Sequence, residues 1–383
     1  MKKKGILVIS ELFLPTKGGT AVWFYEVYRR LGGKEIHILT SKNNTSEKQD
    51  KIHTNSVHRI QLKRYNWIKP ESLIIYLKLF LVGFYIIKRY SIQQIHAGRV
   101  LPEGLVGVIL AKIFKTKVII YAHGEEITTW IQPGKHKTMK YAYKKADAII
   151  ANSNFTKEQL IKLGIDSNAI HLISPGVDLQ RFKKTEKDST LLNKYGIPNN
   201  SVILLSVGRL TRRKGFDNVI KSLPNILKKT KQTHYIIIGI GEDYSYLKRL
   251  SQEYNVSENI HLIGHVSMDE LPKWYNICDI FIMPNRDIDN DTEGFGMVFL
   301  EAAACGKTSI GGNTGGTGNA IIDRKTGLRI DGNNIEEITS SVIKLLTNNS
   351  LKSELEYNAF TRATKLFSWD EVSKKTKDLS EMV

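Results

Sequence analysis

Two carboxylates, Glu293 and Glu301, are separated by seven residues, and the segment between them begins Gly294-Phe295-Gly296. Glycine leaves neighbouring backbone N–H groups accessible. The apolar, alanine-rich run that follows is typical of a helix start, where several N–H groups point in one direction. Ionised carboxylates accept strong hydrogen bonds from hydroxyls, and backbone amides donate to phosphate oxygens. The pattern predicts a site for a ligand with many hydroxyls and a phosphate, such as a nucleotide sugar.

Two cations follow the apolar run Val202–Val207, which reads as a strand. Arg209 and Lys214 stand in the segment Gly-Arg-Leu-Thr-Arg-Arg-Lys-Gly. An arginine guanidinium can fork to a phosphate, and a lysine adds a compact charge. Near the N-terminus, Gly18-Gly19 lies between a first strand and a helix, where the backbone can approach a phosphate closely. A solvated basic turn and a plain glycine loop are the structural alternatives for these two segments.

Two histidines lie at predicted strand ends. His123 follows Val118–Ala122, and His265 follows a short strand and Gly264. The carboxyl ends of parallel strands are where α/β proteins bind ligands. We therefore expect His123 to contact a substrate, although a lone buried histidine is more often structural.

The order of these motifs resembles glycosyltransferase family 4, whose retaining enzymes have the GT-B fold and an E-x7-E motif. The resemblance implies that Glu301 binds the ribose and that Glu293 orients the donor sugar beside the amides near Gly294–Gly296. It implies that Arg209 and Lys214 hold the diphosphate.

The resemblance also implies that His123 hydrogen-bonds the transferred sugar, that the Gly18-Gly19 loop contacts donor and acceptor, and that the base lies near His265. Three residues depart from the family pattern: Gly318 and Asn319 stand where Pro and Glu are usual, and Lys307 stands where Pro often occurs. These departures leave the subfamily open, although lipid and polysaccharide mannosyltransferases are the most similar.

Short apolar runs alternate with helical patterns along the whole chain, which is typical of βαβ units on parallel sheets. A polar segment near residues 183–200 interrupts this alternation. We expect an α/β protein with two Rossmann-like doubly wound domains and an interdomain cleft. The predicted divisions are an acceptor-binding domain at 1–185, a nucleotide-sugar-binding domain at 186–365, and a C-terminal helix at 366–383 that crosses back to the first domain.

The composition narrows the class of partner. The chain has 383 residues, two cysteines and a formal net charge of +18. The positive charge attracts nucleic acid, anionic lipid or small anions, but no nucleic-acid-binding motif occurs. Basic and aromatic residues in two groups, Lys135–Lys145 with Tyr141 and Tyr143, and Lys63–Lys69 with Trp67, favour an anionic membrane surface.

No signal peptide or metal-site spacing is evident, so we expect a cytoplasmic protein, peripheral on the inner face of the membrane, that needs no metal or other cofactor. Asp287, Asp289 and Asp291 alternate in a polar loop and read as solvated.

The predicted function is a retaining glycosyltransferase that moves a hexosyl unit from GDP-mannose or a UDP-sugar to a glycan or lipid-linked acceptor in cell-envelope polysaccharide or glycolipid synthesis. The catalytic residues would be His123, Glu293, Arg209 and Lys214. One alternative is a nucleotide-sugar epimerase, which would act without an acceptor. Another is a non-catalytic basic protein that binds membrane or nucleic acid, which would leave the ordered donor motifs unexplained.

Overall fold

The computed structural model describes residues 5–16, 18–43, 46–64 and 72–383. The chain forms two compact units. Unit 1 comprises residues 1–175 and 369–383, and unit 2 comprises residues 176–368. The division therefore falls ten residues before the predicted boundary at 185, because the Gly176–Asp178 segment already belongs to unit 2.

The described part of unit 1 contains a parallel seven-stranded sheet in the order β3-β2-β1-β4-β5-β6-β7. The interior strand β1 is buried along its length because its sequence, Gly-Ile-Leu-Val-Ile, is apolar on both faces, as a strand covered by helices on both sides requires. The strands are β1 (Gly5–Ile9), β2 (Ile36–Ser41), β3 (Ser56–Ile60), β4 (Ile92–Ala97), β5 (Lys117–Ala122), β6 (Ala148–Ala151) and β7 (Ile170–Leu172).

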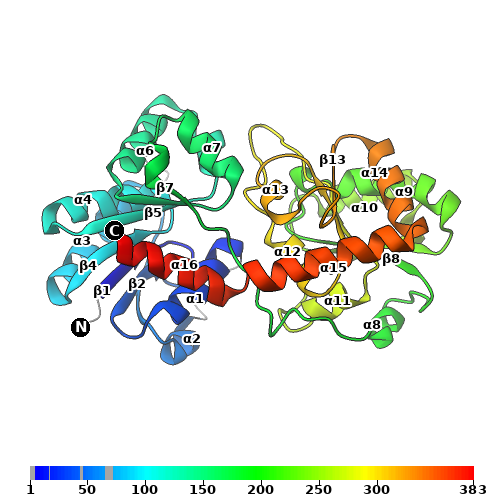
Figure 1. Ribbon diagram of the computed structural model, residues 1–383, viewed down its shortest axis with the longest axis horizontal. Coiled ribbons are helices and arrows are strands. Elements are labelled where there is room, and N and C mark those ends of the chain that lie inside the picture. The colour runs from blue at the N-terminus through cyan, green and yellow to red at the C-terminus, as the bar shows by residue number, and fades with distance from the viewer. Residues whose placement is uncertain (1–4, 17, 44–45, 65–71) are drawn as a thin grey trace. The chain divides into compact units, whose positions relative to one another are not determined.

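Helices cover both faces of this sheet (Figure 1). They are α1 (Gly19–Leu31), α2 (Ser46–Ile52), α3 (Leu73–Arg89), α4 (Leu105–Phe114), α5 (Glu125–Thr129), α6 (Pro133–Lys145), α7 (Asn154–Lys162) and the C-terminal α16 (Trp369–Met382), with short turns η1 (Val100–Gly104) and η2 (Ser167–Ala169).

Helix α16 packs against α1 and is part of the unit 1 core, since Trp369 and Leu379 are buried. Asp370 of α16 forms an ion pair with Arg30 of α1 at 2.8 Å.

Unit 2 repeats this plan with a parallel six-stranded sheet among its described residues, in the order β10-β9-β8-β11-β12-β13. The strands are β8 (Val202–Val207), β9 (Thr233–Ile238), β10 (Ile260–Gly264), β11 (Ile280–Met283), β12 (Ser309–Gly312) and β13 (Leu328–Ile330). The helices are α8 (Ser189–Lys194), α9 (Phe216–Lys229), α10 (Tyr244–Glu253), α11 (Leu271–Ile277), α12 (Met297–Ala304), α13 (Thr317–Ala320), α14 (Ile335–Thr347) and α15 (Asn349–Leu366), with turns η3 (Arg212–Lys214) and η4 (Ser257–Asn259).

Helix α9 illustrates why these segments pack as they do. Its buried apolar residues include Phe216, Val219, Ile220 and Leu223, which recur at intervals of three and four. Side chains at this spacing share one face of a helix and bury it on the sheet.

Each sheet reverses its strand order at one point. In unit 1 the reversal lies between β1 and β4, and in unit 2 between β8 and β11. The crossover helices on the two sides of such a point diverge and leave a crevice beyond the carboxyl ends of the strands, where doubly wound proteins bind ligands. Residues that follow β1, β4, β8 and β11 are therefore the best placed to contact a ligand.

The structure agrees only in part with the predicted exposure of the two basic-aromatic groups. Tyr143 is buried, and its hydroxyl donates to Glu126 at 2.9 Å, so it faces the core and not the surface. Lys135, Lys144 and Tyr141 are exposed. Trp67 and residue 69 lie outside the described residues. Among the described helices, none combines the length and apolar character that crossing a bilayer requires.

Candidate functional site

The predicted donor residues of unit 2 follow the strands at its switch point. Arg209 and Lys214 follow β8, while Glu293 lies in the loop that leads from β11 to α12. Because β8 and β11 are neighbours, segments about eighty residues apart in sequence meet at the carboxyl ends of these two strands, which form the carboxyl edge of the sheet.

A buried charge cluster forms at this edge. The Lys214 ammonium and the Arg213 guanidinium both contact Oε2 of Glu293, with Arg213 Nη1 at 3.0 Å. Only 12% of the Lys214 side chain and 11% of the Glu293 side chain is exposed. Arg213 also contacts Asp291 at 2.9 Å, so this loop aspartate is held by an ion pair and is not simply solvated as its sequence suggested.

Two glycines bring these charges together. Gly215 directly follows Lys214 with φ of 78°, and a Cβ there would lie 2.1 Å from the Pro284 carbonyl oxygen. Gly315 has φ of 58°, and its Cβ would lie 2.3 Å from the carbonyl oxygen of Glu293. Only glycine permits both the left-handed conformation and such close backbone approach. The loops after β8, β11 and β12 are thereby held against one another, with Lys214 beside Glu293.

The cluster fixes the charge of Glu293. Burial alone would favour the neutral acid, but Lys214 and Arg213 outweigh it and lower the pKa of Glu293 to about 2. Glu293 is therefore an ionised acceptor throughout the physiological pH range.

Glu301 differs although it belongs to the same motif. It lies on α12, half-buried, and accepts a hydrogen bond of 2.7 Å from the buried hydroxyl of Tyr275. Burial raises the pKa of Glu301 to about 7, although the Tyr275 hydrogen bond acts in the opposite direction. Gly296, in the left-handed conformation, precedes α12, and the Phe295 ring packs into the core beside Phe367.

The remaining predicted donor contacts are exposed. Arg209 is exposed and makes no ion pair with any residue that the structure describes. His265 is exposed just after β10, and Gly18 and Gly19 are exposed at the start of α1 in unit 1. Arg209 and His265 are thus accessible to a ligand at the carboxyl edge of unit 2.

His123 follows β5 in unit 1 and is buried. Its Nε2 lies 2.8 Å from the Gly98 carbonyl oxygen, which can only accept, so Nε2 carries the proton. The ring packs edge-on against Trp23, and burial lowers the pKa of His123. The imidazole is neutral near pH 7, so its Nδ1 can accept a hydrogen bond from a ligand hydroxyl but the ring carries no permanent positive charge.

Three polar groups at the unit 1 switch point were not predicted from the sequence. Glu11 follows β1, whereas Arg99 and Glu103 follow β4. Buried Glu103 accepts a hydrogen bond of 3.0 Å from the Glu11 amide through Oε1. Three buried atoms, Glu11 Oε1, Glu103 Oε2 and Arg99 Nε, have no hydrogen-bond partner among the described residues.

The charge on Glu103 is sensitive to its surroundings. Burial, reinforced by neighbouring Glu11, raises the pKa of Glu103 to about 7. Glu103 sits in a Val-Leu-Pro-Glu-Gly turn that resembles a loop in sequence. The sequence signal that could have identified Glu103 is its position after a buried strand. The same kind of position predicted a role for His123.

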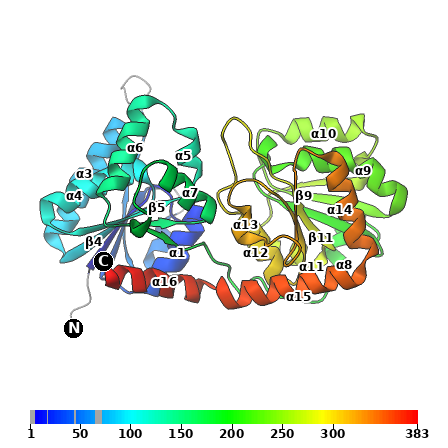
Figure 2. The same ribbon diagram turned by 45° about the horizontal axis from the view of Figure 1, so that its top comes forward.

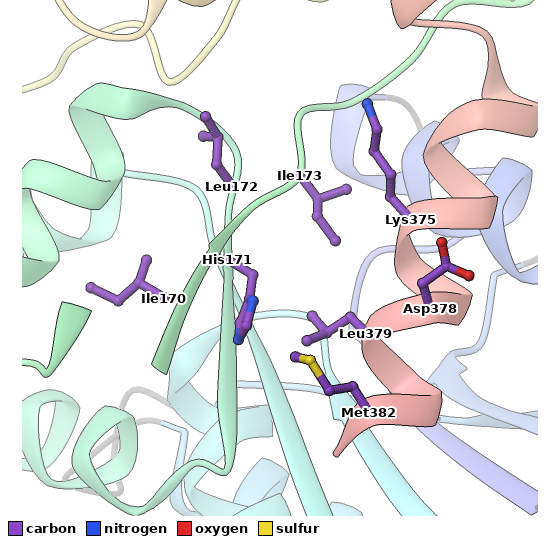
Figure 3. A pocket seen from close by; sticks show the side chains of 8 residues that line it. All are labelled: Ile170, His171, Leu172, Ile173, Lys375, Asp378, Leu379 and Met382. Atoms are coloured by element: carbon purple, nitrogen blue, oxygen red, sulfur yellow. The ribbon is translucent and has the colours of Figure 1, made fainter. Parts of the chain in front are cut away.

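A separate groove of about 450 Å³ lies between β7 and α16 in unit 1. Figure 3 shows Ile170 and Leu172 on the strand side and Leu379 and Met382 on the helix side. No predicted site residue lines it. Among the described residues, no group of three or more His, Cys, Asp or Glu side chains could hold a metal ion.

Family models match both units. The model described as "Glycosyl transferases group 1" matches residues 187–362, and the model described as "Glycosyltransferase Family 4" matches residues 17–181. The first contains Arg209, Lys214, Glu293 and Glu301, and the second contains His123.

Characterised relatives extend over most of the chain. A GDP-mannose-dependent alpha-(1-6)-phosphatidylinositol monomannoside mannosyltransferase of Mycolicibacterium smegmatis is 26% identical over 89% of each chain. A GDP-mannose-dependent monoacylated alpha-(1-6)-phosphatidylinositol monomannoside mannosyltransferase of Corynebacterium glutamicum is 29% identical over 68% of this chain and 69% of that protein. The crystal structure of Anabaena HepE with UDP-glucose has the same fold, with a TM-score of 0.83, 17% identity and full coverage of both chains.

Models of two glycosyltransferase families, group 1 and family 4, thus match the two units, and the chain has the GT-B fold. It is a glycosyltransferase that uses a nucleotide-sugar donor, as its sequence predicted. The two Rossmann-like sheets that the sequence predicted are likewise confirmed.

Proposed function

We propose that this protein is a retaining hexosyltransferase that moves mannose from GDP-mannose to a hydroxyl of a lipid-linked glycan. The main structural support for a donor site is the Lys214–Glu293–Arg213 cluster at the β8–β11 switch point. The names of the mannosyltransferase relatives support GDP-mannose over a UDP-sugar.

The cluster suits the two chemical parts of the donor. The diphosphate is an anion that Lys214 and the exposed Arg209 would bind in place of a metal. The contacts of Glu293 with Arg213 and Lys214 both involve Oε2, which leaves Oε1 to accept a hydrogen bond from a sugar hydroxyl. Glu301, on the helix that follows, would accept from the ribose hydroxyls.

The reaction that we propose needs no protein nucleophile. The bond between the anomeric carbon and the diphosphate oxygen breaks, and the acceptor oxygen bonds to that carbon on the same face. The acceptor proton passes to the departing phosphate oxygen. Lys214 and Arg209 stabilise the negative charge on the departing diphosphate, and neutral His123 hydrogen-bonds the sugar.

Unit 1 would supply the acceptor contacts. Glu11 and Glu103 have buried carboxylate oxygens without partners among the described residues, and Arg99 has a free Nε–H there. A polyhydroxyl acceptor would satisfy all three, donating to the carboxylates and accepting from the guanidinium. Such an acceptor agrees with the phosphatidylinositol mannosides in the names of the relatives.

A lipid-linked acceptor places the enzyme at a membrane surface. We therefore infer that the protein is cytoplasmic and peripheral on the inner face of the membrane. The net charge of +18 supports attraction to anionic lipid, and exposed Lys135, Lys144 and Lys145 contribute to it.

Calorimetric titration with GDP, GDP-mannose, UDP and UDP-glucose, in EDTA and again in Mg²⁺, tests the donor. We expect the guanosine ligands to bind more tightly and EDTA to leave their binding unchanged. Transfer from labelled GDP-mannose to a phosphatidylinositol mannoside, with the anomeric product assigned by NMR, tests the reaction. Binding that requires Mg²⁺, or an inverted product, would contradict this assignment.

A further inference from the structure

Helix α3 is apolar around most of its circumference. Ile75, Leu79 and Ile86 are fully buried against the rest of unit 1. On the opposite side Leu73, Leu77, Leu81 and Tyr85 recur every four residues, and each is between 49% and 57% exposed. Residues four apart form one stripe along a helix. A helix with apolar residues on both faces is normally buried on both faces, so this stripe needs a covering.

Helix α4 enlarges the apolar surface. It packs beside α3, as Figure 2 shows, and the rings of Phe84 and Phe114 lie 4.9 Å apart between them. Ile109 and Ile113, four residues apart on α4, are 42% and 50% exposed. We define the α3–α4 surface as Leu73, Leu77, Leu81, Tyr85, Ile109 and Ile113.

The charges in these two helices have one sign. Neither α3 nor α4 contains an acidic residue, while Lys88, Arg89 and Lys112 are exposed near their C-terminal ends. Arg89 donates to the Tyr85 hydroxyl at 2.9 Å, and its guanidinium lies over the Tyr85 and Tyr90 rings. Apolar side chains with aromatic and cationic neighbours are characteristic of segments that lie in the membrane interface.

We propose that the α3–α4 surface inserts shallowly into the headgroup region of an anionic lipid bilayer. A second copy of the chain is a poorer occupant, because pairing two such surfaces would bring like charges together. An interfacial helix lies in the plane of the membrane and does not cross it, which suits the 17 residues of α3. This docking surface is a feature beyond the proposed transferase function. Only the purpose of docking, which is access to a lipid-linked acceptor, rests on that function.

The test is flotation of the purified full-length protein with vesicles of phosphatidylcholine, with and without about 30% phosphatidylglycerol, which gives the surface a negative potential. We expect binding to the anionic vesicles at low salt. The double variant Leu77→Gln and Leu81→Gln should reduce that binding more than tenfold. The matched control is Tyr357→Gln with Leu366→Gln, which changes two exposed apolar residues of α15 in unit 2 and should leave vesicle binding unchanged.

Three further measurements separate the outcomes. GDP affinity by calorimetry should be equal in all three proteins, which verifies that the donor site of unit 2 is intact. A cooperative urea unfolding transition close to that of the wild type verifies that unit 1 of the α3 variant folds. Unchanged flotation of the α3 double variant, or no flotation of the wild type, would overturn the proposal. So would a wild-type dimer in analytical ultracentrifugation that the α3 variant converts to a monomer without any vesicle binding. Vesicle binding without nucleotide binding would instead refute the proposed function and leave the docking surface standing.

Discussion

The carboxyl ends of β8 and β11 in unit 2 (the β8–β11 edge) and those of β1 and β4 in unit 1 (the β1–β4 edge) hold equivalent positions in the two sheets, whose strand orders match except for the additional β7. They nevertheless carry different charged groups. In unit 2, Lys214 and Arg213 neutralise Glu293. In unit 1, Glu103 and Glu11 leave carboxylate oxygens without partners among the described residues. One topology therefore supplies a location, and the residues after the strands decide which ligand fits it. The first edge suits an anion and the second suits hydroxyl groups.

Replacing the buried lysine should have the largest effect on this contrast. Lys214→Met removes the cation that contacts Glu293, and the loss of a charged hydrogen bond costs about 1.5–3 kcal/mol. We expect GDP affinity to fall roughly ten- to hundredfold by calorimetry and mannosyl transfer to fall at least as much.

The neighbouring Arg212→Met is the control. Arg212 is exposed, and its guanidinium contacts Asp243 and the Tyr246 ring. It should retain GDP affinity close to that of the wild type. A folded Lys214→Met protein with wild-type GDP affinity would mean that the diphosphate binds elsewhere.

The unit 1 edge should respond in a different assay. Glu103→Gln keeps the shape of the side chain but exchanges one acceptor oxygen for a donor amide. We expect the KM for the acceptor to rise about tenfold, which corresponds to about 1.4 kcal/mol, with GDP affinity unchanged. A fall in GDP affinity with an unchanged acceptor KM would remove Glu103 from the acceptor side and weaken the contrast between the two edges.

The two glutamates of the E-x7-E motif sharpen the comparison within unit 2. Glu301→Ala should weaken GDP and GDP-mannose binding alike, by several-fold, because both ligands contain the ribose. Glu293→Ala should reduce transfer more than it reduces GDP binding, because its proposed partner is the sugar. Calorimetry with both ligands and a transfer assay distinguish the two roles. Equal losses of GDP affinity in the two variants would show that the roles are not divided in this way.

Much of this architecture was predictable because parallel strands are apolar on both faces. The predicted limits of the strand Val202–Val207 coincide with β8. Strand β3, by contrast, was missed. Its sequence, Ser-Val-His-Arg-Ile, lies at the sheet edge with every residue only half-buried, and it lacks a continuous apolar run.

The partners of the site residues were harder to predict. The sequence drew attention to Lys214 and Glu293 separately, but their ion pair depends on the close approach of Gly215 and Gly315 to backbone atoms of other loops. Arg213 lay beside Lys214 and received no role. Glu103 was overlooked because nothing in a short Pro-Glu-Gly turn reveals that the carboxylate is buried. Motifs identify chemical groups, whereas burial and pairing come from long-range packing.

The pH dependence of stability should also distinguish the two edges, because it has opposite signs there. The folded-state pKa of Glu103 is about 7, above its ordinary value of 4.5. Between these two pH values the folded protein holds a proton that the unfolded chain releases, so Glu103 makes the free energy of unfolding fall as the pH rises. The folded-state pKa of Glu293 is about 2. Its stabilising contribution is complete above about pH 4.5, the unfolded-state value, and is lost as the pH falls toward 2.

Urea unfolding of the wild type and Glu103→Gln between pH 5 and 8 measures the first contribution. The variant cannot ionise at position 103, so its stability relative to the wild type should increase by about 1–3 kcal/mol from pH 5 to pH 8. Glu293→Gln serves as the comparison, because the wild-type carboxylate remains ionised over that range. Its stability difference from the wild type should be nearly constant there. A Glu103→Gln difference that is equally constant would mean that the Glu103 carboxyl is not held neutral by burial, and the unit 1 edge would then resemble the ionised edge of unit 2.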